Sequence, residues 1–217
     1  MQIPAAFVLR GQRFDAARPA VMGILNRTPD SFYARARFTE LDDALAALDQ
    51  LVADGADLVD VGGVRAGQVG DWVGADDEIE RVRPFLLAAR ERHPDVLLSL
   101  DTWRSEVALA CAGARVDLVN DTWAGADPDL VAAAAELGAG YVVSHTGGLP
   151  PRTDPVGVTY SPEPDGVVTA VLDGLRAGAE RAVAAGLPAG GVLNDPTLDL
   201  CKTTPHPPRP PPAPPHP

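Results

Sequence analysis

Acidic and amide side chains recur in this sequence at one kind of place, at or near the end of a short apolar run. The members of this set are Asn26, Asp60, Asp101, Asn120, Asp121, His145 and Asp195. Carboxylates and side-chain amides hold polar ligands and metal ions, but Asp and Asn also cap helices that begin after a turn. Capping accounts for one or two members, such as Asp101 or Asp121. The shared position of the whole set favours a single polar site.

The apolar runs have the length of β-strands and alternate with Ala-rich stretches of helical periodicity. Strands are predicted at 20–26, 57–63, 96–102, 116–122, 140–146 and 190–196, and helices at about 40–54, 76–92, 104–114, 127–138 and 165–186. Continuous apolar strands are typical of a parallel sheet that is buried on both faces. The alternation therefore predicts βαβ units in an α/β fold. The earlier segment 7–15 fits a small hairpin.

The predicted fold is α/β, a TIM (β/α)8-type barrel that is incomplete, with about six βα units present. In such a barrel the carboxyl ends of the strands form the active-site face. In a doubly wound sheet, which is the alternative, the same residues would line the crevice where the strand order reverses. Both arrangements gather the polar strand ends at one mouth.

Composition excludes several classes of protein. The 217 residues carry a formal charge of -12, which argues against a general nucleic-acid binder because phosphate backbones require clustered Lys and Arg. No apolar run approaches the roughly 20 residues that span a bilayer, and the start of the chain does not resemble a signal peptide. The two cysteines, Cys111 and Cys201, are too few for a disulfide scaffold. We therefore expect a cytoplasmic protein without nucleic-acid or membrane partners.

Some further side chains have an ordinary and a functional interpretation. His145 is expected to be a loop hydrogen-bonding group more often than a ligand-binding one. Trp103 and Trp123 each follow an Asp-Thr pair, so they either form a wall of the mouth or pack in the core. Arg104 is expected to form a salt bridge at the start of a helix rather than to act in catalysis.

Six sequence blocks, taken together, resemble the dihydropteroate synthase family. They are MGILNRTPDSF (22–32), LVDVGG (58–63), LSLDTWRSEVA (98–108), LVNDTWAG (118–125), VSHTGGLP (143–150) and LNDPTLDLCKT (193–203). Their order and spacing match the family's blocks, and they cover residues 20 to 203. The substitutions within them resemble a divergent, actinobacterial-type second copy of the enzyme. The resemblance implies a pterin-binding TIM barrel.

The resemblance also implies an activity and roles for single residues. Family enzymes join 6-hydroxymethyl-7,8-dihydropterin diphosphate to p-aminobenzoate in folate biosynthesis. They are usually homodimers, but the resemblance places the dimer face in later helices that this sequence lacks. Asp101, Asn120 and Asp195 match residues that bind the pterin ring, and Lys202 matches the lysine of the family's GFGKT block at the same substrate. Asn26 matches the asparagine that contacts Mg²⁺ and the diphosphate. The implied cofactor is therefore Mg²⁺, and the implied partners are the two small-molecule substrates.

The chemistry of a pterin agrees with these assignments. A pterin presents a guanine-like edge with adjacent N–H donors, and one carboxylate such as that of Asp195 can accept two of them. Asn120 supplies a donor and an acceptor for a second edge. The leaving diphosphate needs a metal ligand that adds no negative charge, and the side-chain carbonyl of Asn26 meets that requirement. Stabilisation of the departing anion is expected to be the largest catalytic effect.

The sequence also departs from the family pattern. The second block normally continues GGESTRPG, whereas this chain has GGVRAGQVG (62–70), with Val64 in place of the acid and Arg65 as a partial substitute for the family's arginine. The last block reads DLCKT instead of GFGKT. Family members continue through two more βα units with a further lysine and an Arg-x-His pair. The alternative function is therefore an impaired or inactive pterin-binding homologue, or a truncated product without function.

Three regions are expected along the chain. Residues 1–19 form an N-terminal hairpin extension, 20–204 form the truncated barrel, and 205–217 form a proline-rich tail. Nine of the 13 tail residues are proline, so the tail cannot form a helix or an inner strand. A disordered end or a shifted reading frame explains the tail, and a ligand for SH3-like or WW-like modules is the functional alternative.

Overall fold

The computed structural model describes residues 6–28, 40–65, 72–153, 158–161 and 165–198. Its main sheet contains β3 (Met22–Asn26), β4 (Leu58–Gly62), β5 (Leu97–Asp101), β6 (Leu118–Asp121), β7 (Gly140–Ser144) and β8 (Val192–Asp195). The six strands are parallel and lie in the order β3-β4-β5-β6-β7-β8. All six strands coincide with predicted ones. The tail at 205–217, Cys201 and Lys202 lie outside the described residues.

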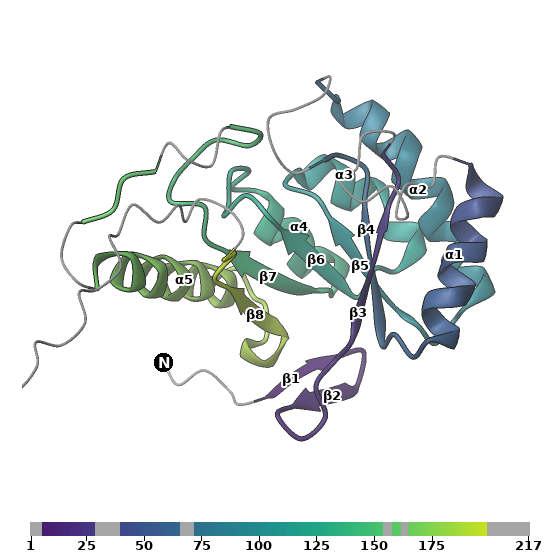
Figure 1. Cartoon of the computed structure of the whole chain (residues 1–217), viewed down its shortest axis with the longest axis horizontal. Helices are drawn as coiled ribbons and strands as arrows, with labels where there is room; N and C mark the ends of the chain where they lie inside the picture. Colours follow the sequence, from purple (N-terminus) through teal and green to yellow (C-terminus); the bar gives the residue numbers. More distant parts are fainter. Residues whose placement is uncertain (1–5, 29–39, 66–71, 154–157, 162–164, 199–217) are drawn as a thin grey trace, which may run out of the picture.

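Helices follow the strands in alternation and cover one face of the sheet (Figure 1). They are α1 (Leu41–Ala53), α2 (Ala75–Arg92), α3 (Ser105–Ala110), α4 (Leu130–Leu137) and α5 (Gly166–Ala184), with short 3-10 turns η2 (Ala112–Ala114) and η4 (Ala189–Gly191). Every predicted helix is present, although the one expected at 104–114 divides into α3 and η2. The prediction of a βα-repeat fold is therefore confirmed.

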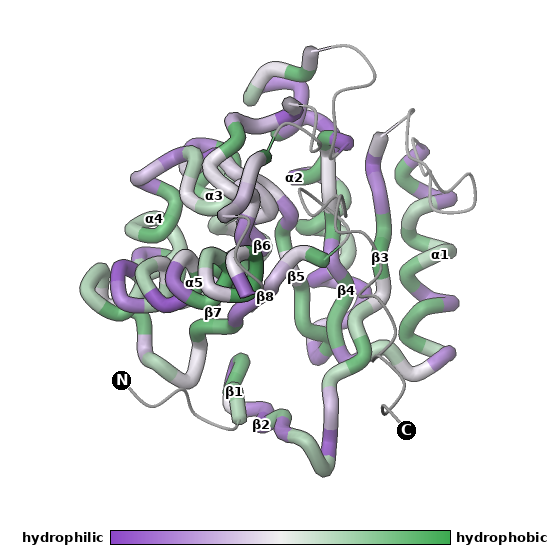
Figure 2. The backbone as a smooth tube through the Cα atoms, turned by 60° about the vertical axis from the view of Figure 1, so that its left-hand side comes forward, coloured by the Kyte–Doolittle hydropathy of each residue, from purple (hydrophilic) through white to green (hydrophobic). Residues whose placement is uncertain are grey.

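Apolar side chains of strands β4 to β8 enter two different cores, one on each face of the sheet. Val61 and Leu100 face the helices and belong to the larger core, together with Leu48 of α1 and Phe85 of α2. The sheet's other face, the inner face of the curved sheet, holds a smaller apolar cluster at the amino ends of the strands, which includes Leu97. Figure 2 shows apolar colours along β4, β5 and β7 and mixed colours along α1 and α5. Strands buried on both faces explain why these runs are continuously apolar.

An antiparallel hairpin closes the amino end of the sheet. It consists of β1 (Ala6–Leu9) and β2 (Gln12–Asp15), which confirms the hairpin predicted at 7–15 (Figure 1). Phe7 stacks on Phe14 with ring centroids 5.0 Å apart, and Leu9 and Phe14 join the inner cluster with Leu118. The hairpin thus covers apolar side chains that the inner face would otherwise expose at this end.

Gly140 of β7 provides a test of this packing. An added Cβ at this position would lie 2.5 Å from Leu9 Cδ2 and 2.8 Å from the carbonyl oxygen of Gly191. We expect Gly140→Ala to lower the free energy of unfolding, because overpacking typically costs about 1–3 kcal/mol and the removal of a strand glycine returns only about 0.5–1 kcal/mol. Thermal unfolding measures the difference. Gly190→Ala, whose new Cβ meets nothing within 4 Å, is the control, and equal stability of both variants would contradict the packing argument.

The sheet does not close into a complete barrel among the described residues. Strands β3 and β8 each have one neighbour in the sheet. A cavity of about 720 Å³ lies at these two edges beside the hairpin, lined by Met22 of β3 and Leu193 of β8 among others. Ile24 of β3 is 61% exposed for the same reason. The expected six-unit arrangement is confirmed.

Across the described segments, none of the helices is both long and apolar enough to span a bilayer.

Candidate functional site

The β-sheet register places most of the predicted site residues in one row. Asn26 of β3 pairs with Gly62, Gly62 with Asp101, and Asp101 with Asn120. Asp195 ends β8 and pairs with Ser144, the last residue of β7. Because all six strands are parallel, these four polar residues lie at the same, carboxyl end of the sheet. Their side chains are half-buried.

Gly62 provides the space in which two of these side chains meet. An ideal Cβ on Gly62 would lie 3.1 Å from Asp101 Oδ2 and 3.4 Å from Asn26 Oδ1. Both oxygens therefore lie close to one point above the glycine, where a Cβ would crowd the oxygen of Asp101. This arrangement brings an amide oxygen and a carboxylate oxygen together at the mouth, which are the donor types that Mg²⁺ takes.

A buried hydrogen-bond network supports Asn120 from below. Asp60 of β4, which is 6% exposed, accepts a 3.0 Å bond from Asn120 Nδ2 with one oxygen and a 2.5 Å bond from Ser99 Oγ with the other. The amide nitrogen of Asn120 is thereby directed toward Asp60. Ser99 was not among the candidate residues, although its position two residues before Asp101 puts it on the same face of the strand.

Two carboxyl groups of the mouth have raised pKa values. Burial raises the pKa of Asp101 well above its ordinary value, and the negative charge of Asp60 raises it further, whereas a 3.1 Å bond from Thr122 Oγ1 acts in the opposite direction. Burial also raises the pKa of Asp60, against the bonds from Ser99 and Asn120. Burial is therefore the main cause of both pKa shifts, and the charge of Asp60 adds to the shift of Asp101.

Asp195 and Asp121 differ in their surroundings. The backbone N–H of Thr197 donates a 2.7 Å bond to Asp195 Oδ1, which fixes the turn after β8. Asp121 instead accepts the backbone N–H groups of Trp123 and Gly125 and, at 2.6 Å, the hydroxyl of Tyr141. Asp121 thus holds the turn after β6 through backbone N–H groups, a structural role close to the capping role that the sequence left open for this residue.

Two arginines that follow the strands are bound to other parts of the protein. Arg27, after β3, donates to the backbone oxygens of Arg81 at 3.1 Å and Glu40 at 2.9 Å. Arg104, after β5, forms a buried ion pair with Glu78 of α2 and donates to the backbone oxygen of Val73 at 2.7 Å. The salt bridge expected for Arg104 is confirmed. Both guanidinium groups therefore hold the loops of the mouth in place.

Two tryptophans that follow strands β5 and β6 are packed rather than open. Trp103 and Trp123 form an edge-to-face pair with centroids 6.4 Å apart and cluster with Val64 and Val73. They are 8% and 2% exposed, so the packing interpretation holds. His145 is also buried. Its ring stacks near Tyr160, at 6.1 Å between centroids, and its backbone N–H donates to Thr197 Oγ1.

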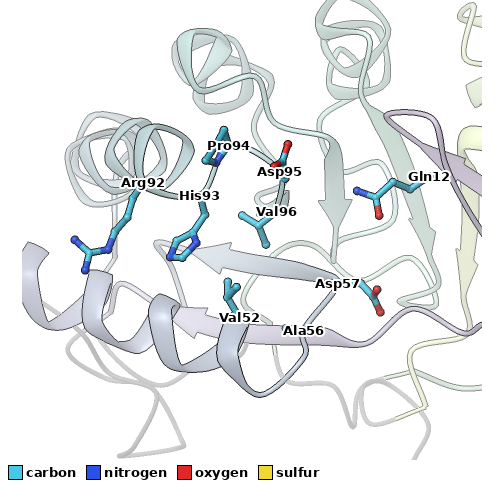
Figure 3. A pocket seen from close by; sticks show the side chains of 9 residues that line it. All are labelled: Gln12, Val52, Ala56, Asp57, Arg92, His93, Pro94, Asp95 and Val96. Carbon is cyan, nitrogen blue, oxygen red and sulfur yellow. The ribbon is translucent and has the colours of Figure 1, made fainter.

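Another cavity, of about 330 Å³, lies where α2 ends and β5 begins, away from the mouth (Figure 3). His93 and Arg92 lie on one side of it, and Gln12 and Asp57 lie across from them. Both Arg92 and His93 bind the carboxylate of Asp49, and these bonds lower the pKa of Asp49. The amino end of a βα-repeat sheet is where stability rather than chemistry is usually located, and these contacts join α1 to α2.

Comparison with known proteins places this geometry in a family. Residues 22–208 match the family described as pterin binding enzyme. The chain belongs to this family. It is 50% identical over 199 residues to a protein named inactive dihydropteroate synthase 2 from Mycobacterium leprae, and the match covers 92% of this chain and 68% of that protein. It is 37% identical over 185 residues to a dihydropteroate synthase from Streptococcus pyogenes, covering 85% and 65%.

Solved structures give the same result. The crystal structure of a Yersinia pestis dihydropteroate synthase with a sulfonamide drug superposes with a TM-score of 0.80 at 33% identity, covering 91% of this chain and 70% of that chain. The family and fold expected from the six blocks are thus confirmed. This dihydropteroate synthase-like chain spans about two thirds of the length of the proteins it matches.

Proposed function

We propose that this chain binds the pterin ring of 6-hydroxymethyl-7,8-dihydropterin diphosphate at the carboxyl ends of β3, β5, β6 and β8. The observation that carries this proposal is the row formed by Asn26, Asp101 and Asn120 in adjacent register, with Asp195 at the same end of the sheet. Carboxylates at the mouth suit the adjacent N–H donors of a pterin edge. The relatives' names support a pterin as the ligand.

The network below the mouth supports the same ligand. Because Asn120 donates one amide N–H to Asp60, its carbonyl oxygen and its second N–H are the groups left to meet a ligand. Asp101 and Asp195 also present oxygens. These oxygens suit a ligand that brings N–H donors, and a 2-aminopterin edge does so.

The diphosphate and Mg²⁺ belong to the same proposal. Asn26 Oδ1 and Asp101 Oδ2 both lie close to one point above Gly62, and Mg²⁺ is commonly held by one or two protein oxygens together with substrate phosphates. Among the described residues no group of three or more His, Cys, Asp or Glu side chains forms a metal site, so the diphosphate would supply most of the ligands. When bound, Mg²⁺ neutralises charge on the leaving diphosphate.

Further parts of the family's chemistry are proposed on resemblance alone. Lys202 is proposed to bind the pterin, and p-aminobenzoate is the proposed second substrate. The family's usual assembly is a homodimer, and the proposed location is the cytoplasm. The sequence blocks of this chain support these assignments.

A second candidate function is a pterin-binding homologue with impaired catalysis. The relative at 50% identity is named inactive, and the loop after β4 carries Val64 inside an apolar cluster where active family members have an acid. The positions of Arg27 and Arg104, which bind protein groups, favour the same alternative. We therefore propose pterin binding with weak synthase activity.

Calorimetric titration of the full chain with the pterin diphosphate and Mg²⁺ tests the binding. We expect Asp195→Ala to weaken binding by about 10- to 100-fold, because a hydrogen bond to a charged group contributes roughly 1.5–3 kcal/mol. Asp173→Ala is the control, since Asp173 is an exposed residue of α5 that pairs only with Arg176 nearby. Equal affinity of the wild type and Asp195→Ala would show that the ring binds elsewhere.

A further inference from the structure

A cavity of about 570 Å³ lies outside the row of mouth residues. It is formed by the loop after β6 at 123–126, by 144–151 at the end of β7 and in the loop beyond it, and by one side of α5, which runs beside β7 (Figure 1). Asn26, Asp101, Asn120 and Asp195 do not line it. The cavity is therefore distinct from the proposed pterin site.

Hydrogen-bond donors without partners gather around this cavity. Arg181 of α5 lines it and makes no hydrogen bond or ion pair with the described residues. Thr146 Oγ1 and Trp123 Nε1 belong to lining residues that are 1% and 2% exposed, and neither atom has a hydrogen-bond partner in the described part of the chain. A buried polar group without a partner costs about 1–3 kcal/mol, so two beside one cavity require an explanation.

The backbone around the cavity is also unusual. Ala124, with φ 54°, occupies the left-handed region that side chains rarely adopt, and Gly125, Gly147 and Gly148 have φ values of 78°, 67° and 83°. Backbone held in such conformations is concentrated at functional sites. The remaining wall is largely small or apolar, with Leu149 and Ala177 among its residues, so it suits the flat apolar body of a ligand.

We propose that this cavity binds a small organic anion, with its charged group on Arg181 and its apolar body against the loop after β7. Donors without acceptors require a ligand that supplies acceptor oxygens, and the guanidinium group favours an anionic one. Carboxylates and phosphate monoesters share this chemistry. The hydroxyl of Thr146 and the indole N–H of Trp123 gain partners when the loops move to admit the anion.

Titration of the ¹⁵N-labelled full chain with benzoate and with phenyl phosphate tests the site. With at least one of the two anions, saturable chemical-shift changes are expected for the Trp123 indole N–H and for the backbone amides of Gly147 and Gly148. The anion that binds more tightly shows whether the site prefers a carboxylate or a phosphate monoester. Benzamide, which is neutral and similar in shape, is expected to give none. Equal saturable shifts with benzamide would overturn the proposal.

Variants separate Arg181 from general charge effects. Arg181→Gln is expected to weaken anion binding at least tenfold and Arg181→Lys less, while Arg176→Gln, on the same helix but outside the cavity lining, changes it less than twofold. Thr146→Val should weaken it several-fold. An unchanged affinity in Arg181→Gln, with the helix intact by circular dichroism, would exclude the site.

Discussion

Dihydropteroate formation by the purified full chain, with Mg²⁺, the pterin diphosphate and p-aminobenzoate, is expected to be at least about 10³-fold slower than by an active family member. The reaction releases an anionic diphosphate, and the loss of a single preorganised donor at such a centre typically lowers the rate by about 10²–10³. The loop after β4 lacks the Ser-Thr-Arg triplet that active enzymes carry there. Rate is therefore expected to fall far more than pterin affinity.

Two other arginines that follow strands of the sheet, Arg104 and Arg27, are held by protein groups. Arg104 is buried against Glu78 and the backbone of Val73, and Arg27 is bound to backbone oxygens beside α1 and α2. Moving either guanidinium to a substrate would leave buried groups without partners, Glu78 above all. Both arginines are thus expected to stay where they are during turnover.

The assay compares initial rates with those of an active synthase under the same conditions. Heat-denatured chain gives the background, and pterin binding measured in parallel shows that the site is intact. Turnover within tenfold of the active enzyme would contradict the electrostatic argument. Turnover at the background level together with pterin binding would agree with it.

Much of the fold follows from local patterns in the sequence. The runs at 57–63 and 96–102 are mostly apolar because β4 and β5 are buried on both faces, so their length and position were predictable. The placement of Asp101 and Asn120 at one end of the sheet then follows from parallel topology. The hairpin at 7–15 was also predictable from a local pattern, because it consists of two short strands joined by a tight turn.

Long-range contacts account for what the sequence did not predict. The bonds from Asn120 and Ser99 to Asp60 join three strands, and no spacing along the chain specifies them. Likewise, Asp121 accepts a hydrogen bond from Tyr141, which is twenty residues away on the next strand. The sequence alone therefore could not distinguish Asp121, which has a structural role, from the residues of the mouth. Strand register had to be known before these roles could be separated.

Asp101→Asn is expected to make the protein more stable at neutral pH while it abolishes most pterin binding. Burial and the charge of Asp60 raise the pKa of Asp101 in the folded protein above its value in the unfolded chain. Between these two values the unfolded chain releases the proton and the folded protein keeps it. The free energy of unfolding therefore falls as pH rises through this interval, and the carboxyl remains unfavourable above it.

Asparagine removes this pH dependence without changing the size of the side chain. Its carbonyl oxygen can still accept the bond from Thr122 Oγ1. The gain in stability over the wild type is expected to grow as pH rises from about 4, where the unfolded carboxyl begins to ionise. For a domain of this size, each kcal/mol gained raises Tm by about 2–4 °C. Replacing a functional group that destabilises the fold commonly raises stability and lowers function.

Thermal unfolding of both proteins between pH 4 and pH 8, with pterin titrations at pH 7, measures the two effects together. Asp173→Asn is the control, because that side chain is 67% exposed and its removal is expected to change stability by less than about 0.5 kcal/mol. A variant less stable than the wild type at pH 7, or a difference that does not vary with pH, would show that Asp101 is not an unfavourable buried carboxyl. Unchanged pterin affinity would separately remove Asp101 from the proposed site, since the amide that replaces it offers one acceptor oxygen, which Thr122 Oγ1 already uses.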